Sequence, residues 1–145
     1  MEFVFLTKDF YLNYTHCTEI EQKTNRPYIM FKIRIDNIDY AIPLRSNITH
    51  KHVYLTDKNN NCGLDFSKTI IITNSNYINT DTTPHIRQNE FNFLKGKEYI
   101  IKKKLLRYIE NYKKALQHLE AKHNENLCKY STLQYFHKEL NIYAK

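Results

Sequence analysis

The N-terminal part of the chain has short apolar runs separated by polar residues, the pattern of a small sheet with short connections. The apolar run at 3–6 predicts a first short strand. Residues 9–14 have the spacing of a short amphipathic helix, capped near Thr7 or Asp9. A polar loop is expected after this helix.

Two strands are predicted near 28–35 and 38–43, where β-branched and aromatic residues alternate with charged ones. The dipeptide Asp36-Asn37 separates the two runs, and both residue types tolerate a positive φ. The pattern therefore predicts a tight hairpin. In a hairpin the start of the first strand lies beside the end of the second, so we expect Arg26 to lie near Ser46.

Three further features follow the hairpin, and the last of them is the clearest buried strand. Residues 53–55 are a candidate short strand, and the asparagine-rich segment 57–63 is a candidate loop. The continuous β-branched run at 69–73 is typical of a strand covered on both sides. Pro84 ends the irregular segment after it.

From Glu90 onward the apolar period lengthens to three or four residues, which indicates helices. The lysines at 102–104 and 113–114 fall largely away from the apolar stripe, so we expect them to face solvent or a partner. The apolar stripe of the long helix consists of Ile101, Leu105, Tyr108, Tyr112, Ala115 and Leu119. A shorter helix is predicted over 129–141, with inward residues Tyr130, Leu133, Phe136 or His137, and Leu140.

This order of elements predicts an α+β fold in a single domain of 145 residues. A small twisted or barrelled sheet would occupy about 1–90 and a helical part about 91–145. Two glycines leave no room for a glycine-rich phosphate loop, so nucleotide-fuelled chemistry is not expected. The sequence has neither an apolar run long enough to span a bilayer nor an N-terminal secretion signal, so a cytoplasmic protein is expected.

The charge of the chain is unevenly distributed. Residues 1–94 carry ten Lys/Arg and ten Asp/Glu, whereas 95–145 carry twelve and five, which accounts for the net charge of +7. A basic C-terminal third favours a polyanionic partner such as nucleic acid, although a lysine-rich composition by itself gives the same excess. Cys17, Cys62 and Cys128 lack the close spacing of a zinc or redox motif and are interpreted as reduced thiols.

The segment from Tyr40 to Tyr54, YAIPLRSNITHKHVY, places many hydrogen-bonding and proton-transferring groups directly after an apolar run. A solvated polar loop would explain them. His50 and His52 form an H-x-H pair, but no third ligand lies close in sequence, so neither a metal nor a cofactor is expected. Metal-free RNA cleavage requires only an acid, a base and donors for the developing charge, because the ribose 2′-OH is the nucleophile. The segment and Arg26 supply these groups.

Four features follow one another along the chain: NRPYIMFKIRI at 25–35, YAIPLRS at 40–46, LDFSKTIIIT at 64–73 and the lysine-rich helices. In this order they resemble the toxins of type III toxin-antitoxin systems. The toxins are the ToxN/AbiQ-like endoribonucleases, and the chain is most similar to their CptN branch. The strand that ends in Pro-Leu-x-Ser carries most of the resemblance.

The resemblance implies an SH3-like antiparallel β-barrel of the Kid/MazF/CcdB type with a long C-terminal helix and shorter ones. It implies metal-independent cleavage of cellular RNA that leaves a 2′,3′-cyclic phosphate. The implied antitoxin is a small repeated RNA that folds as a pseudoknot, is processed by the toxin from its precursor and inhibits it. Several copies of toxin and RNA would form a closed assembly in the bacterial cytoplasm.

The basic residue before the first hairpin strand of the family falls on Arg26, and its serine after Pro-Leu-x falls on Ser46. Arg45 stands where the family often has Thr or Ser, and Asn47-Ile48 where it often has Pro-Lys. We therefore expect Ser46 to contact phosphate or ribose and Arg26 to stabilise charge, with His50 as acid or base. The predicted catalytic set is Ser46, Arg26, His50, Lys51 and Thr49. The predicted RNA-binding set is Arg45, Asn47, His52, Lys32, Arg34, Lys102, Lys103, Lys104 and Lys113.

Two other functions are consistent with the sequence. One is a non-catalytic RNA-binding module in which the lysines of 102–114 contact phosphates. The other is a DNA-binding regulator that uses the C-terminal helix, but no recognition helix preceded by a short turn is evident.

Overall fold

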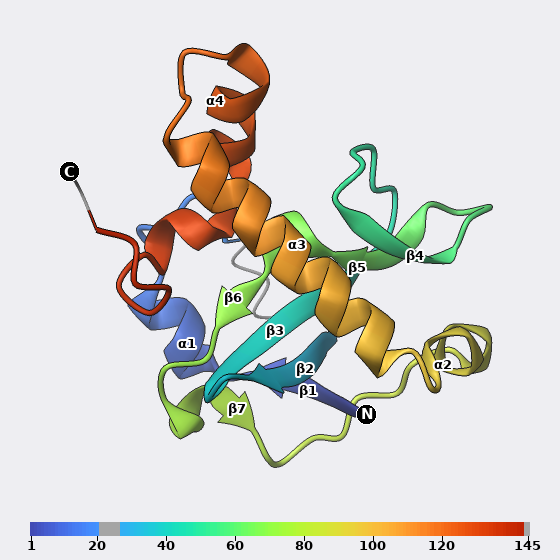
Figure 1. The fold of residues 1–145 in the computed structure, drawn as a ribbon. Helices are drawn as coiled ribbons and strands as arrows, with labels where there is room; N and C mark the ends of the chain where they lie inside the picture. The colour runs from blue at the N-terminus through green and yellow to red at the C-terminus, as the bar shows by residue number, and fades with distance from the viewer. Residues whose placement is uncertain (21–26, 144–145) are drawn as a thin grey trace.

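The computed structural model describes residues 1–20 and 27–143, which form the α+β fold that the sequence predicts (Figure 1). The strands are β1 (Glu2–Leu6), β2 (Met30–Ile35), β3 (Ile38–Arg45), β4 (Val53–Asp57), β5 (Cys62–Asp65), β6 (Ile70–Ile71) and β7 (Ile78–Asn79). The α-helices are α1 (Lys8–Asn13), α2 (Gln88–Leu94), α3 (Glu98–Leu116) and α4 (Lys122–Tyr130). Short 3-10 helices cover Phe66–Lys68, Ser75–Tyr77 and Thr132–Tyr135.

All strand pairs in this part of the chain are antiparallel, in the order β4-β5-β3-β2-β1-β7, and β6 pairs with β3. The two end strands, β4 and β7, do not pair with each other in the described residues. The sheet is therefore open there and does not form the closed barrel that the resemblance implies.

The predicted hairpin between β2 and β3 is confirmed. Ile35 pairs with Ile38, and Asp36 and Asn37 take φ values of 51° and 66°. Positive φ at both central residues defines a tight turn whose twist matches that of the strands. At the open end of the hairpin the Leu44 amide donates to the Ile29 carbonyl at 2.8 Å. The beginning of the first strand therefore lies beside the end of the second, as predicted.

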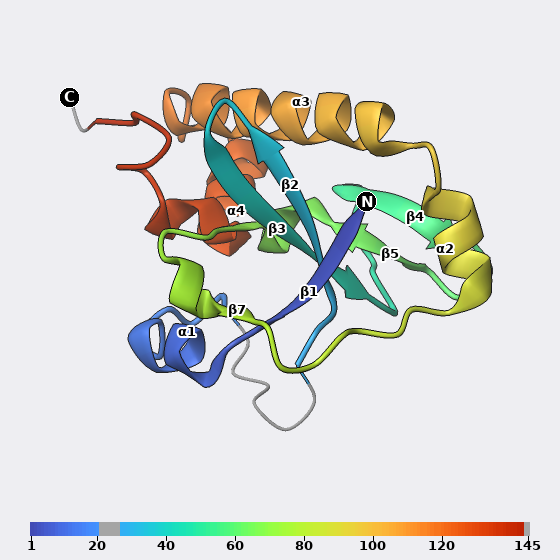
Figure 2. The same cartoon turned by 90° about the horizontal axis from the view of Figure 1, so that it is seen from below.

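Helix α3 crosses one face of the sheet (Figures 1 and 2). Its predicted apolar stripe is buried from Ile101 to Ala115, and Lys102, Lys103 and Lys104 are exposed. The stripe ends before Leu119, which lies beyond the helix and is 45% exposed. The fully buried side chains at the centre of the core include Phe31, Ile42, Leu64, Leu105 and Tyr112.

The predicted helix over 129–141 is wrong. Helix α4 ends at Tyr130, which is exposed, and Ser131 then adopts an extended conformation. The Ser131 hydroxyl accepts a hydrogen bond from the Leu133 amide at 3.2 Å, so it caps a separate 3-10 helix. Serine competes with a helix in this way because its side chain can bond to nearby backbone. Of the residues predicted to face inward, Leu133, Phe136 and Leu140 are buried, whereas Tyr130 is not.

The predicted strand at 69–73 is only partly formed. Ile70 and Ile71 pair with β3, whereas Thr73 is exposed. All three cysteines are buried and free of disulfide bonds, in agreement with the interpretation as reduced thiols. Among the described residues, no helix is both long and apolar enough to cross a membrane.

Gly63 allows β4 and β5 to approach closely, and its replacement by alanine is expected to destabilise the fold. An added Cβ would lie 2.3 Å from the Tyr54 carbonyl oxygen and 2.8 Å from the Leu55 Cα. Both are backbone atoms that cannot rotate away, so the strands must separate. We expect Gly63→Ala to lower the free energy of unfolding by about 1–3 kcal/mol in urea titration. Gly96→Ala is a poor comparison because its φ of 75° is itself strained, so an exposed Thr80→Ala variant serves as control.

Candidate functional site

Asp65, at the end of β5, is fully buried and organises the segment that follows β3. Its Oδ2 accepts from the Arg45 guanidinium at 2.5 Å. Its Oδ1 accepts from the Ser67 amide at 3.0 Å and the Ser67 hydroxyl at 2.6 Å. The same oxygen lies 3.1 Å from His50 Nε2. We call Arg45, His50, Asp65 and Ser67 the Asp65 cluster.

The cluster keeps the buried carboxylate ionised. Burial by itself would raise the pKa of Asp65, but hydrogen bonds from His50 and Ser67, the charge of His50 and the hydrogen bond from Arg45 outweigh it. The result is a pKa of about 2. Burial lowers the pKa of Arg45, yet hydrogen bonds with Tyr28 and Asp65 raise it overall, so the guanidinium stays charged. A paired, hydrogen-bonded ion of this kind fixes the position of both partners.

The predicted polar loop is held at several points. Asn47 takes a φ of 55°, and the amide of buried Ile48 donates to the Asn61 carbonyl at 3.0 Å. The His52 amide lies 3.0 Å from His50 Nδ1, and His50 Nε2 lies 3.1 Å from Asp65 Oδ1, so both ring nitrogens have partners within the protein. The Phe66 amide donates to the His52 carbonyl at 2.9 Å. These hydrogen bonds fix the backbone of the loop and the direction of the His50 side chain.

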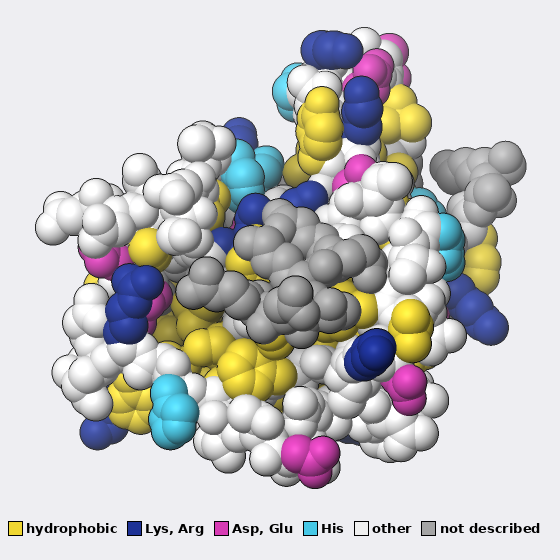
Figure 3. Space-filling model, turned by 180° about the vertical axis from the view of Figure 1, so that it is seen from behind, with side chains coloured by type: hydrophobic (Ala, Val, Ile, Leu, Met, Phe, Trp, Pro, Cys, Tyr) yellow, Lys and Arg dark blue, Asp and Glu magenta, His cyan; other side chains and the backbone are white. Residues whose placement is uncertain are grey.

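Ser46 is exposed and lines a groove of about 450 Å³, which we call the Ser46 groove. A second depression of about 440 Å³ shares Ser46, Cys62 and Arg87 with it and extends along the asparagines of the β4–β5 connection. Figure 3 shows this side of the molecule, with blue and cyan side chains at the edge of apolar surface. The groove is lined by Pro27, Tyr28, Ile29, Leu44, Arg45, Ser46, Cys62, His85, Ile86, Arg87 and Glu90.

Cationic and proton-transferring groups dominate the polar lining of the Ser46 groove. Arg45, His85 and Arg87 line it together with one carboxylate, Glu90, whose Oε2 accepts from the Thr56 hydroxyl at 2.6 Å. Arg87 Nε lies 3.9 Å from the other oxygen of Glu90, at the limit of an ion pair. The groove can therefore hold an anion beside a hydroxyl donor and an imidazole.

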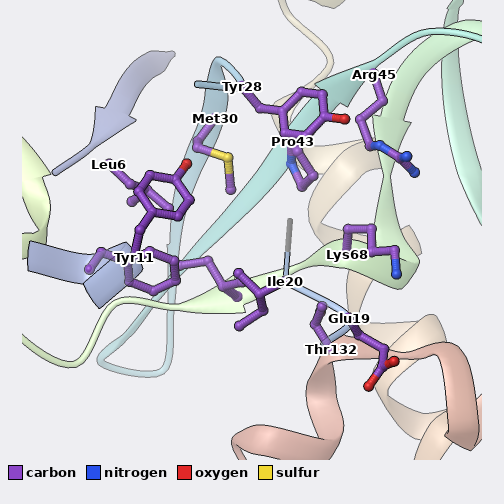
Figure 4. A pocket seen from close by; sticks show the side chains of 12 residues that line it. Leu6, Tyr11, Glu19, Ile20, Tyr28, Met30, Pro43, Arg45, Lys68 and Thr132 are labelled. Atoms are coloured by element: carbon purple, nitrogen blue, oxygen red, sulfur yellow. The ribbon is translucent and has the colours of Figure 1, made fainter. Parts of the chain in front are cut away.

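Tyr28 and Arg45 also line a second, smaller pocket, of about 30 Å³ (Figure 4). The Arg45 guanidinium lies over the Tyr28 ring at 5.6 Å. In the close-up, Arg45 and Lys68 lie at the polar end of this pocket, and Met30 and Pro43 line its apolar part. A volume of this size holds about one water molecule. It is too small for a nucleotide, so the larger Ser46 groove is the candidate site.

The structure brings together only part of the predicted set. Ser46, Arg45 and Asn47 line the groove and its extension, whereas His50 belongs to the Asp65 cluster. Thr49 is exposed without lining either depression. Lys51 and His52 line a different pocket, against α3 and α4. Arg26 lies outside the described residues.

The remaining predicted RNA-binding residues lie apart from the Ser46 groove. Lys32 is half-buried, 3.4 Å from Glu2 and 3.8 Å from Asp39, and Arg34 pairs with Asp39 at 3.1 Å. Lys113 is half-buried and lines a pocket near the C-terminal end of the described chain. Lys102, Lys103 and Lys104 point outward from α3.

Sequence reasoning missed Asp65, Ser67, His85 and Arg87. The Asp-x-Ser spacing at 65–67 is a capping signal that was available, because a capping carboxylate accepts from an amide two residues later. His85 and Arg87 carried no such signal. They reach the groove only because the irregular segment before α2 returns to the open end of the hairpin.

Within residues 1–20 and 27–143, no three His, Cys, Asp or Glu side chains form a group that could hold a metal ion. Comparison of the chain with protein-family models, curated proteins and solved structures gave no match.

Proposed function

We propose that this chain is a metal-independent endoribonuclease that acts in the Ser46 groove. One observation carries the proposal: Arg45, anchored by Asp65, ends β3, the exposed Ser46 follows it, and both line one groove with His85 and Arg87. RNA is a polyanion with an internal nucleophile, so such a groove has the groups needed to bind and cleave it.

The cleavage step follows from the chemistry of RNA. The ribose 2′-OH loses its proton to a base, and its oxygen forms a bond to the adjacent phosphorus while the bond from phosphorus to the 5′-oxygen breaks. The leaving 5′-oxygen takes a proton from an acid, and the product is a 2′,3′-cyclic phosphate. Hydrogen-bond donors and cations near the phosphate stabilise the charge that develops on its oxygens.

The groove suggests a role for each group. Ser46 donates a hydrogen bond to the phosphate, and Arg45 and Arg87 offset its charge. His85 can give or take a proton, because an imidazole does both near neutral pH. His50 was predicted to do this, but both of its ring nitrogens are engaged within the loop and the Asp65 cluster. In the proposed mechanism His50 therefore positions the loop.

The resemblance to ToxN/AbiQ-like toxins extends this proposal. The chain would be the toxin of a type III system, with a fold related to the Kid/MazF toxins. It would act in the bacterial cytoplasm and be inhibited by its own repeated pseudoknot RNA in a closed RNA-protein assembly. The antiparallel sheet crossed by a long C-terminal helix is compatible with that relationship.

Incubation of the purified, RNA-free protein with single-stranded RNA in EDTA tests the proposal. We expect cleavage that leaves fragments with 2′,3′-cyclic phosphate ends. The same sequence made with 2′-O-methyl ribose should remain intact, because its nucleophile is blocked. Binding of the RNA without cleavage would reject the enzyme and favour the non-catalytic RNA-binding module.

A further inference from the structure

A second basic pocket lies between the segment after β3 and helices α3 and α4. Its volume is about 440 Å³, and its polar lining consists of lysine, histidine and asparagine without an Asp or Glu. We call it the His52 pocket. It is lined by Lys51, His52, Asn111, Lys114, Ala115, His118, His123, Asn124 and Leu127.

Positive charge is concentrated in this pocket. Burial and the charges of His50 and Lys51 lower the pKa of His52. Two acids on α4 and the connection before it are already paired: Glu120 with His118 at 3.4 Å, and Glu125 with Lys122 at 3.1 Å. Asp65 is buried on the other side of His50, within its cluster. The pocket thus has cations and neutral donors but no carboxylate in its lining.

Two residues that line the His52 pocket, His52 and Asn124, are held by contacts within the protein. The His52 ring packs edge-on against buried Tyr108, with ring centres 5.4 Å apart. The Asn124 side-chain amide donates to the His118 carbonyl at 2.9 Å, which closes the connection between α3 and α4. Preorganised donors bind an anion at a lower entropic cost than freely moving lysines.

We propose that the His52 pocket binds a backbone phosphate of the RNA strand whose neighbouring nucleotides occupy the Ser46 groove. The inference rests on the proposed function and adds a second contact site to it. One segment joins the two, with Ser46 at one end on the groove and Lys51 and His52 at the other end in the pocket. A strand that follows this segment meets basic groups at both ends. The exposed lysines at 102–104 do not line this pocket.

The test compares the binding of labelled 2′-O-methyl RNA of about 4 and about 16 nucleotides by fluorescence anisotropy over a range of salt. The double variant Lys51→Ala/Lys114→Ala should weaken binding of the long RNA about tenfold. It should also reduce the slope of log K against log salt by about 1.4, because each lost contact with single-stranded RNA removes about 0.7. Binding of the short RNA should stay within about twofold of the parent, because a short strand fills the groove alone.

The matched control is Lys8→Ala/Lys138→Ala, which removes the same charge from exposed positions that line neither the Ser46 groove nor the His52 pocket. If the two double variants reduce the slope equally, or neither does, the His52 pocket is not a phosphate site. Circular dichroism confirms that each variant is folded. Cleavage of RNA by the parent protein is measured separately. If the salt slope changes only in the pocket variant and the parent does not cleave RNA, the phosphate site is supported and the endoribonuclease activity is rejected. Cleavage with an unchanged slope would reject the subsite alone.

Discussion

Replacing Ser46 by alanine is expected to reduce RNA cleavage about 100-fold or more while leaving the fold intact. The loss follows from removing a donor aimed at the charge that develops on the phosphate, in a groove where Arg45 is already held by Asp65. Ser46 is exposed, so the change creates no cavity and should alter the free energy of unfolding by less than about 0.5 kcal/mol. Cleavage rates at saturating RNA, with thermal unfolding measured in parallel, check both parts.

An exposed serine elsewhere, Ser75, supplies the matched control, and Ser75→Ala should cleave at the parental rate. In cells that express the protein without an antitoxin RNA, Ser46→Ala should relieve toxicity while Ser75→Ala does not. Undiminished cleavage by folded Ser46→Ala would remove this hydroxyl from the site. The search for the acting group would then move to His85 and Arg87, which line the same groove.

The parts of the fold that the sequence predicts well are those decided by local chemistry. The hairpin at Asp36-Asn37 follows from two residues that tolerate positive φ, and the stripe of α3 follows from spacing alone. The error at 129–141 arose where local and tertiary effects compete. Ser131 ends a run that looks helical, because its hydroxyl caps the next turn and also accepts from the buried Tyr108 hydroxyl at 2.8 Å. A contact between residues so far apart in the sequence leaves no local pattern.

The candidate site likewise contains residues whose positions could be predicted from the sequence and others whose positions could not. Ser46 and Arg45 follow the end of a recognisable strand, so their nearness to the start of the preceding strand could be predicted. The position of His50 could not, because it depends on Asp65, which is reached only when β5 pairs with the end of β3. That pairing places both ring nitrogens of His50 against other groups of the protein, which is why the proposed mechanism gives His50 a positioning role in place of the predicted one as acid or base.

Replacing Asp65 by asparagine is expected to cost about 3 kcal/mol of stability at neutral pH, the largest effect of a single change that this structure predicts on the free energy of unfolding. The substitution keeps the shape of the side chain but leaves Arg45, whose side chain is only 22% exposed, beside a neutral amide. It also replaces an acceptor for Ser67 and His50 by a group that donates from one side. Urea titration of parent and variant measures the difference.

The difference between the two proteins should depend on pH, since the pKa of Asp65 is about 2 in the folded protein against 3.8 ordinarily. A carboxyl whose pKa is lowered by folding stabilises the folded state above its unfolded pKa. That contribution, roughly 2 kcal/mol here, is lost as the pH falls through the folded pKa. The deficit of Asp65→Asn should therefore be constant above about pH 5 and shrink toward pH 2. Asp81→Asn, at an exposed position, should differ from the parent by less than about 0.5 kcal/mol throughout. A deficit that is equally large at pH 7 and pH 2 would mean that the ionised form of Asp65 does not hold the cluster together.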